Sequence, residues 1–219
     1  MRRLVTWIAG FGLALFLLGL ALMPLTVPGF TRIVGSRTSL AAESGLGPAR
    51  MTLVAEQVRA FVVDGEAGTL PAIVDGKPGF DPAAVSHLLD VRRVLAYARI
   101  VTGILALVLL TGLAFEVAQK RTARIADTLC AGAFLATVLV LLCVIAATVN
   151  FEQFFTSFHG LFFKAGTWTF AEDSLLIRTF PEQFWTIAGA SWAGLVLAGA
   201  GLIAAGACVL RSGQGRQPT

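Results

Sequence analysis

Two histidines are the side chains in this sequence best suited to chemistry. His87 and His159 are the only histidines among the 219 residues. Because imidazole exchanges a proton near neutral pH, a pair of histidines favours general acid–base catalysis. Both have acidic residues nearby in sequence, among them Asp90 and Glu152. One alternative stays open at this point, namely that each is an ordinary histidine at a membrane interface.

His159 lies in residues 150–185, the stretch around which we expect the chain to be organised. Phenylalanines recur there at three- and four-residue steps, the spacing of one helical face: Phe151, Phe154, Phe155, Phe158 and Phe162. The stretch is too charged to cross a bilayer and too aromatic to be freely solvated. It therefore predicts a structure at the membrane surface. The phenylalanines fit helix packing, a membrane anchor or the lining of an acyl-chain pocket.

Other kinds of catalytic site are less well supported by the spacing. Ser86 and Ser157 are close in sequence to the histidines, but on a helix each faces away from its neighbouring imidazole. A zinc site would draw on both histidines and on Asp90, Glu152 or Asp173, in a spacing that matches no zinc signature. We therefore expect no metal and no cofactor. The three cysteines all lie in apolar stretches, which predicts small buried residues and no disulfides.

The elements that carry these residues are predicted to be membrane helices. The chain is 56% hydrophobic and 14% charged, with a mean hydropathy of +0.79, and this is typical of integral membrane proteins. Four windows are long enough to span a bilayer, at about 4–23, 94–115, 125–149 and 184–210. We interpret the first as a retained helix and not a signal peptide, because its apolar run is too long. The fold class expected is all-α integral membrane, as one membrane domain over residues 1–219.

Charge predicts the orientation of these helices. Basic residues gather on one side of a four-helix topology: Arg2, Arg3, Lys120, Arg121, Arg124, Arg211 and Arg216. By the positive-inside rule that side is cytoplasmic. We expect a multi-pass protein of the bacterial cell membrane with both termini in the cytoplasm. The net charge of +4 then reflects topology, and no nucleic-acid partner is expected.

The two remaining connections, 25–93 and 150–183, are predicted to form a small extracellular cap that carries both histidines. Within the first, Val54, Val58 and Phe61 have helical spacing in a short amphipathic helix over 50–63. Asp81-Pro82 predicts the start of a helix that continues into the second span. Two further patterns concern the fourth span. Thr179-x-x-Glu182 predicts a capping box at its start, and small residues at Ala190, Gly194 and Ala198 predict a packing face.

The motifs of the second connection resemble a known family. They read Phe154-x-x-x-Phe158-His159-x-x-Phe162-Phe163, then Trp168 and Phe170, Asp173-x-Leu-Leu-Ile, and Phe180-Pro181-x-x-Phe184-Trp185. Together with His87-x-x-Asp90-Val91-Arg92 before the second span, they resemble the bacterial lipoprotein intramolecular transacylases and their wider integral-membrane family. Four helices with an outer cap match that family along nearly the whole chain.

The resemblance implies an acyltransferase whose partners are a diacylglyceryl-modified lipoprotein substrate and membrane lipid. The sn-2 acyl chain would move to the amino group of the N-terminal cysteine, which gives a lyso-form lipoprotein. By motif position, His87 and His159 would be the catalytic acid–base pair, with neither assigned as base or acid. The candidates for binding or orienting substrate are Asp90, Arg92, Glu152, Phe155, Phe158, Phe162 and Trp168.

A second interpretation comes from a different class of protein. The chain would then be a non-enzymatic membrane subunit whose aromatic cap binds a partner protein or a lipid. Loss of phenylalanines in 151–163 would then matter more than loss of either histidine. A transporter is the weakest alternative, since the spans lack charged residues away from their ends.

Overall fold

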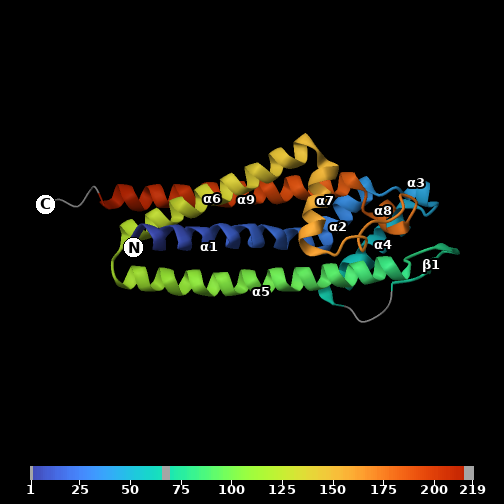
Figure 1. The fold of residues 1–219 in the computed structure, drawn as a ribbon, viewed down its shortest axis with the longest axis horizontal. Helices are drawn as coiled ribbons and strands as arrows, with labels where there is room; N and C mark the ends of the chain where they lie inside the picture. The colour runs from blue at the N-terminus through green and yellow to red at the C-terminus, as the bar shows by residue number, and fades with distance from the viewer. Residues whose placement is uncertain (1, 66–69, 215–219) are drawn as a thin grey trace. The chain divides into compact units, whose positions relative to one another are not determined.

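Long α-helices dominate the computed structural model, which describes residues 2–65 and 70–214 (Figure 1). Four helical stretches are long and apolar enough to cross a membrane: Arg3–Thr26, Pro82–Ala118, Thr122–Val149 and Glu182–Gly213. The predicted all-α membrane fold with four such helices is confirmed. The chain divides into two compact units. The expectation of a single membrane domain over residues 1–219 stays a prediction.

The first unit, here the bundle unit, comprises residues 1–22, 99–148 and 192–219. It contains α1 (Arg2–Leu22), most of α5 (Pro82–Ala118) and α6 (Thr122–Val149), and most of α9 (Glu182–Gln214). Small residues dominate its buried core: Ala14, Ala21, Ala133, Ala136, Ala193 and Ala200, with Leu17, Val140 and Val196. Small side chains let helix backbones approach closely, which is how helices associate without a hydrophobic driving force in lipid.

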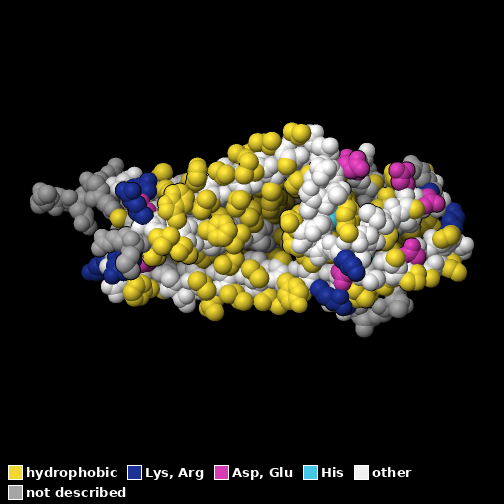
Figure 2. All heavy atoms as spheres, in the orientation of Figure 1, with side chains coloured by type: hydrophobic (Ala, Val, Ile, Leu, Met, Phe, Trp, Pro, Cys, Tyr) yellow, Lys and Arg dark blue, Asp and Glu magenta, His cyan; other side chains and the backbone are white. Residues whose placement is uncertain are grey.

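The close approach of α1 to α6 is visible at single glycines. A Cβ atom on Gly10 would lie 2.7 Å from the Cβ of Ala131, and one on Gly132 would collide with Leu13. Trp192 of α9 adds a polar contact, because its indole N–H donates to the carbonyl of Leu18, 3.0 Å away. The outward sides of the helices are apolar, as Figure 2 shows in yellow, with exposed residues such as Leu107 and Leu110. That surface suits contact with lipid.

The second unit, here the loop unit, comprises residues 23–98 and 149–191. It begins with η1 (Met23–Thr26), α2 (Pro28–Thr38), α3 (Ala41–Ser44), α4 (Pro48–Arg59) and η2 (Ala60–Asp64). A short antiparallel pair, β1 (Ile73–Val74) and β2 (Lys77–Pro78), precedes the first turns of α5. From the second connection come α7 (Phe151–Phe162), α8 (Leu175–Thr179) and the start of α9.

One hydrophobic core joins the two connections within the loop unit. Met51, Val54 and Val58 of α4 are 0–3% exposed and lie in the same cluster as Leu175 and Leu176 of α8. A backbone hydrogen bond of 2.9 Å from Leu40 N–H to the Arg178 carbonyl links the connections a second time. The amphipathic helix predicted over 50–63 is therefore confirmed, and its apolar face packs against the second connection. That this unit is extracellular stays a prediction.

Helix α5 begins where the sequence predicts. The carboxylate of Asp81 accepts a hydrogen bond of 2.7 Å from the Ala84 N–H, which caps one of the free donors of the first turn. Pro82 then opens a helix of 37 residues without a break. His87 thus lies in the second turn of the continuous helix that contains the predicted second span.

Two predictions for the fourth span are wrong. Thr179 does not cap α9, because its hydroxyl donates to the Leu175 carbonyl inside α8 and the side chain is fully buried. The small-residue face is also elsewhere. Ala190, Gly194 and Ala198 are exposed, whereas Ala193, Val196 and Ala200 are buried. In a helix that is apolar on all sides, composition alone does not fix which face packs.

Candidate active site

Both histidines belong to the loop unit, which brings them together from α5 and α7. The centroids of the His87 and His159 rings are 6.2 Å apart, and the ring planes are inclined by 31°. No hydrogen bond joins these two side chains, since the rings are too far apart. The separation is suited to a small reacting group held between two imidazoles, each within hydrogen-bonding reach of it.

Helix α7 positions His159 through its amphipathic sequence. Asn150 caps the helix by accepting a hydrogen bond of 2.9 Å from the Gln153 N–H. Along α7 the apolar residues form one stripe, and His159 lies at the edge of that stripe next to Phe155. The predicted helical face of phenylalanines is therefore present, with the imidazole on its flank.

Aromatic rings surround the pair. The Phe155 ring centroid is 3.9 Å from that of His159, and the Trp168 centroid is 4.8 Å from it. On the other side, Phe163 and Phe170 lie 4.8 and 5.6 Å from the His87 ring. These neighbours are apolar apart from the indole N–H. His87 is buried, whereas His159 and the four rings are partly exposed, so the surroundings disfavour charge most strongly at His87.

Burial governs the protonation of both histidines. His87 is only 7% exposed, and its pKa is lowered to about 4, first by burial and then by the charge of His159, against a smaller opposing effect of Asp90. Burial also lowers the pKa of His159, and this is partly offset by its hydrogen bond to the Phe155 carbonyl. At neutral pH both imidazoles are therefore uncharged and able to accept a proton.

The tautomer of His159 follows from the same hydrogen bond. Its Nδ1 lies 2.9 Å from the Phe155 carbonyl oxygen. A carbonyl only accepts, so Nδ1 must carry the hydrogen and donate it. In the neutral ring, Nε2 then has the free lone pair. His159 is thereby held as a base with a defined reactive nitrogen.

Two polar atoms of the site are buried without a partner among the described residues. They are Nδ1 of His87 and the indole nitrogen Nε1 of Trp168. Buried polar groups in folded proteins are nearly always hydrogen-bonded, because an unmatched one costs about 1–3 kcal/mol. Both atoms therefore have unused hydrogen-bonding capacity within the site.

The residues predicted to orient the substrate lie in different surroundings in the structure. Trp168 is in the site. Asp90 instead forms an ion pair of 2.7 Å with Arg93, and acts on His87 only through its charge. The guanidinium of Arg92 lies over the Phe61 ring, 4.2 Å from the centroid. Glu152 is exposed in the first turn of α7, and no described contact joins it to either histidine.

The predicted phenylalanines also differ in their positions. Phe155 contacts His159 directly, and Phe158 lies farther away at 5.8 Å. Phe162 packs on Phe158 and Phe163, with no described contact to a histidine. Phe158 and Phe162 are 47% and 49% exposed. Both lie on the phenylalanine stripe of α7, Phe158 in edge contact with His159 and Phe162 next to Phe163.

Phe163 and Phe170 contact His87 but were absent from the predicted site residues. Phe163 stands four residues after His159, so the helical step could have indicated it. Phe170 lies in the irregular segment between α7 and α8, where no periodicity predicts which way a side chain points.

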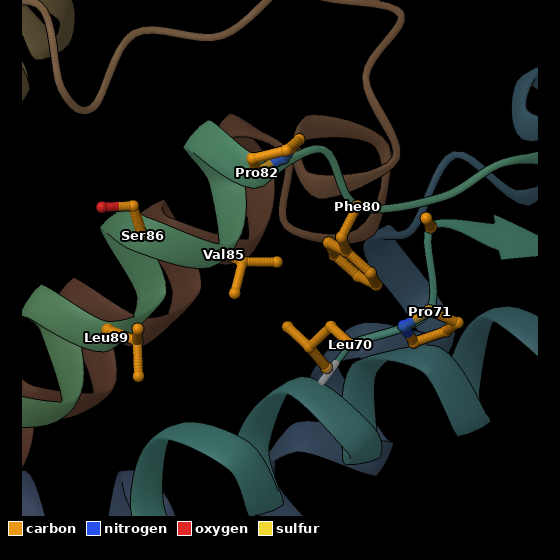
Figure 3. Close-up of a pocket in the computed structure, with 8 residues that line it drawn as sticks. Leu70, Pro71, Phe80, Pro82, Val85, Ser86 and Leu89 are labelled. Carbon is orange, nitrogen blue, oxygen red and sulfur yellow. The ribbon is translucent and has the colours of Figure 1, made fainter. Parts of the chain in front are cut away.

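The competing kinds of site find no support in this geometry. Ser157 is exposed and accepts a hydrogen bond from Gln153. Ser86 is among the residues that line a separate apolar groove of about 450 Å³, with Val85 and Leu89 of α5 and residues that flank the hairpin, such as Leu70 and Phe80 (Figure 3). That groove uses a different face of α5 from His87. For zinc, the described residues contain no group of three or more His, Cys, Asp or Glu side chains able to hold an ion.

Comparison with solved structures gives the same fold. The membrane-integral lipoprotein intramolecular transacylase of Bacillus cereus matches with a TM-score of 0.82 and 18% identity, covering 99% of each chain. Two forms of that protein with a histidine replaced also match. The arginine form has a TM-score of 0.78 and covers 98% of this chain and 93% of its own. The alanine form has a TM-score of 0.79 and covers 99% and 96%. Both are 18% identical to this chain.

Two sequence comparisons, one with a related protein and one with a family model, also give matches. An uncharacterised protein of Aquifex aeolicus is 28% identical over 111 residues, which is 51% of this chain and 48% of that protein. The match therefore spans about half the length of this curated relative. The family model described as lipoprotein intramolecular transacylase Lit matches residues 7–185, a range that includes α7 and both histidines. The resemblance inferred from the motifs is confirmed, and the chain belongs to the lipoprotein intramolecular transacylase family.

Proposed function

We propose that this protein moves the sn-2 acyl chain of a diacylglyceryl lipoprotein to the amino group of the lipoprotein's N-terminal cysteine. The observation that carries the proposal is the pair of imidazoles 6.2 Å apart in an aromatic enclosure, in a chain that belongs to the family over residues 7–185. A histidine is also the residue replaced in two of the Bacillus cereus structures, which supports a catalytic role for a histidine.

The reaction is an exchange of an ester for an amide. The amine nitrogen attacks the carbonyl carbon of the sn-2 ester, a C–N bond forms, and the carbonyl oxygen takes the negative charge. As this intermediate collapses, the bond between the carbonyl carbon and the glyceryl oxygen breaks. The proton lost by the amine is the one that the glyceryl oxygen receives, so the site gains or loses no proton over a cycle.

We assign the proton transfer to His159 Nε2. The hydrogen bond from Nδ1 to the Phe155 carbonyl fixes the ring, leaves Nε2 unprotonated at rest, and stabilises the imidazolium once it forms. Because burial lowers the pKa of this group, the imidazolium readily returns its proton to the glyceryl oxygen. His87 offers a second nitrogen, Nδ1, without a partner among the described residues, and we infer that it orients the reacting amine.

No enzyme nucleophile is required, because donor and acceptor are parts of one molecule. Effective molarities of about 10⁵–10⁸ M are available to well-oriented intramolecular reactions. The protein's task is to fold the substrate so that amine and ester meet. The phenyl rings of Phe155, Phe163 and Phe170 around the histidines suit acyl chains and exclude the water that would hydrolyse the ester.

We further propose that the loop unit faces outward from the cell membrane and that both chain termini are cytoplasmic. The support is the positive charge of Lys120 and Arg121 in the short α5–α6 turn, of Arg124 at the start of α6, and of Arg211 near the end of α9. Arg216, which belongs to the same prediction, lies outside the described residues. An outward site would meet lipoproteins on the face of the membrane where they are anchored.

The test is the lipid form of a lipoprotein in a bacterium that makes the diacylglyceryl form and lacks its own N-acylating enzyme. When this chain is expressed, mass spectrometry should find an N-terminal lipopeptide of unchanged mass with one acyl group on the amine. Loss of one acyl chain would instead identify a hydrolase. An unchanged lipid form, with the protein folded in the membrane, would refute the proposal and favour the non-enzymatic binding subunit.

A further inference from the structure

Trp168 has an indole N–H for which the fold provides no partner. Its Nε1 is buried, and no acceptor among the described residues lies within hydrogen-bonding distance. Its ring lies 4.8 Å from that of His159 and 6.4 Å from that of Phe155. The ring that carries the unmatched donor therefore lies next to the histidine to which we assign the proton transfer.

In two other tryptophans of the chain the indole N–H donates a hydrogen bond to a backbone carbonyl. The N–H of Trp185 donates to the Phe180 carbonyl at 3.0 Å, and that of Trp192 to the Leu18 carbonyl at 3.0 Å. An amphipathic ring whose N–H is buried normally finds such a partner, because a lost hydrogen bond costs about 1–3 kcal/mol. Trp168 is the exception among these three, and it is the one in contact with a catalytic candidate.

The intermediate of the proposed reaction needs a donor of this kind. When the amine adds to the ester, the carbonyl oxygen becomes an oxyanion in a site lined with phenyl rings. A charge there is costly unless a fixed dipole or hydrogen-bond donor points at it. His159 cannot supply that donor at rest, because its one N–H is directed at the Phe155 carbonyl.

We propose that the indole N–H of Trp168 binds the oxyanion of the tetrahedral intermediate. This inference rests on the proposed acyl transfer and adds a catalytic residue to it. In the step concerned, the nitrogen lone pair of the substrate forms the C–N bond and the carbonyl π electrons move to oxygen. Trp168 donates to that oxygen throughout, and releases it when the carbonyl reforms and the glyceryl oxygen departs with the proton. The indole N–H is a donor that does not ionise, so it stabilises the oxyanion without transferring its own proton.

The experiment compares two Trp→Phe variants in detergent, with a synthetic diacylglyceryl lipopeptide. Trp168→Phe keeps an aromatic ring and deletes the N–H. Trp185→Phe makes the same change at a ring that also contacts Phe155, 6.3 Å away, but whose N–H is already bonded. We expect kcat to fall about 10²–10³-fold in Trp168→Phe with KM nearly unchanged, and to stay within about threefold of wild type in Trp185→Phe.

Binding of two analogues distinguishes an oxyanion donor from a packing residue. A phosphonate at the sn-2 position carries the charge of the intermediate, whereas an sn-2 ether keeps the acyl chain and lacks the oxygen to which the indole would donate. Trp168→Phe should weaken phosphonate binding at least about tenfold and leave ether binding within about threefold, as expected for an interaction made in the transition state. Equal losses for both analogues would overturn the proposal, and so would equal kcat losses in the two variants.

A second replacement at position 168 keeps the proposal testable if the Trp168→Phe variant folds poorly. Benzothienylalanine at position 168 keeps the shape of tryptophan and places sulfur where the N–H was. It should show the same loss of kcat and of phosphonate binding, and activity near wild type would overturn the proposal. If the wild-type chain itself transfers no acyl group, the proposed function fails, which is a different result from full activity in the variants.

Discussion

Acid should destabilise this protein through His87, because the fold holds that imidazole uncharged. His87 is 7% exposed among aromatic rings, and its pKa is lowered from 6.5 to about 4. In the unfolded chain the pKa returns to its ordinary value. Between these two values the unfolded state binds more protons than the folded state, so the free energy of unfolding decreases as the pH falls.

The size of the effect follows from the two pKa values. The gap between 6.5 and about 4 corresponds to about 3 kcal/mol, at about 1.4 kcal/mol per unit. This contribution is fully present above pH 6.5 and lost progressively down to about pH 4, below which His87 adds no further slope. In a chain of this size we expect the melting temperature to fall by roughly 6–12 °C over that range. His159, whose pKa is also lowered by burial, adds to the decrease in the same direction.

The assay is thermal unfolding of the purified protein in one detergent between pH 4 and pH 7.5, followed by intrinsic fluorescence. The informative variant is His87→Leu, which removes the titrating group and leaves an apolar side chain in an apolar place. It should lose most of the acid sensitivity, and the double variant His87→Leu/His159→Leu should lose nearly all that the site contributes. If His87→Leu melts with the same pH dependence as wild type, the reasoning from burial is refuted.

Three further predictions concern activity and packing. His87→Ala and His159→Ala should each reduce acyl transfer to a lipopeptide at least about 10²-fold, while the amount of folded protein in the membrane stays the same. Activity within a few fold of wild type in either variant would contradict the assignment of the two histidines as the catalytic pair. Asp81→Ala removes the cap of α5 and should lower the unfolding free energy by about 1 kcal/mol in the same melting assay, with no shift counting against the cap. Gly10→Ala should destabilise the bundle by about 1–3 kcal/mol, because its Cβ would meet α6, whereas Gly112→Ala, which has open space, serves as the matched control and should not.

Much of the fold could be predicted because strong local signals agree with the tertiary structure. Asp81 and Pro82 mark the start of α5 at the residue where it begins. The four apolar windows became four helices of membrane-spanning length. The phenylalanine steps of α7 placed Phe155 and His159 side by side. Each of these depends on neighbours within one helix, which is the range over which periodicity is informative.

The rest depends on contacts that no local pattern encodes. Thr179 has the right spacing to cap α9. Its hydroxyl instead donates to the Leu175 carbonyl, because residues 175–179 form the separate short helix α8. The position of Trp168 beside His159 arises from the irregular segment after α7, whose path is fixed by packing. Asp90 and Arg92 share a helix with His87, but Asp90 forms an ion pair with Arg93 and the Arg92 guanidinium lies over the Phe61 ring. That either residue orients the substrate stays a prediction.

The most direct measurement of the central claim uses a mixture of two lipopeptides. One carries natural acyl chains and an unlabelled peptide, and the other carries deuterated acyl chains and an isotope-labelled peptide. After incubation with the purified protein, tandem mass spectrometry reads which acyl chain is on which amine. Intramolecular transfer catalysed by the histidine pair predicts unchanged masses, an acyl group on each cysteine nitrogen, and no mixed products in wild type. Transfer should be reduced at least about 10²-fold in His159→Ala. Mixed products, loss of an acyl chain, or full transfer without His159 would contradict the account.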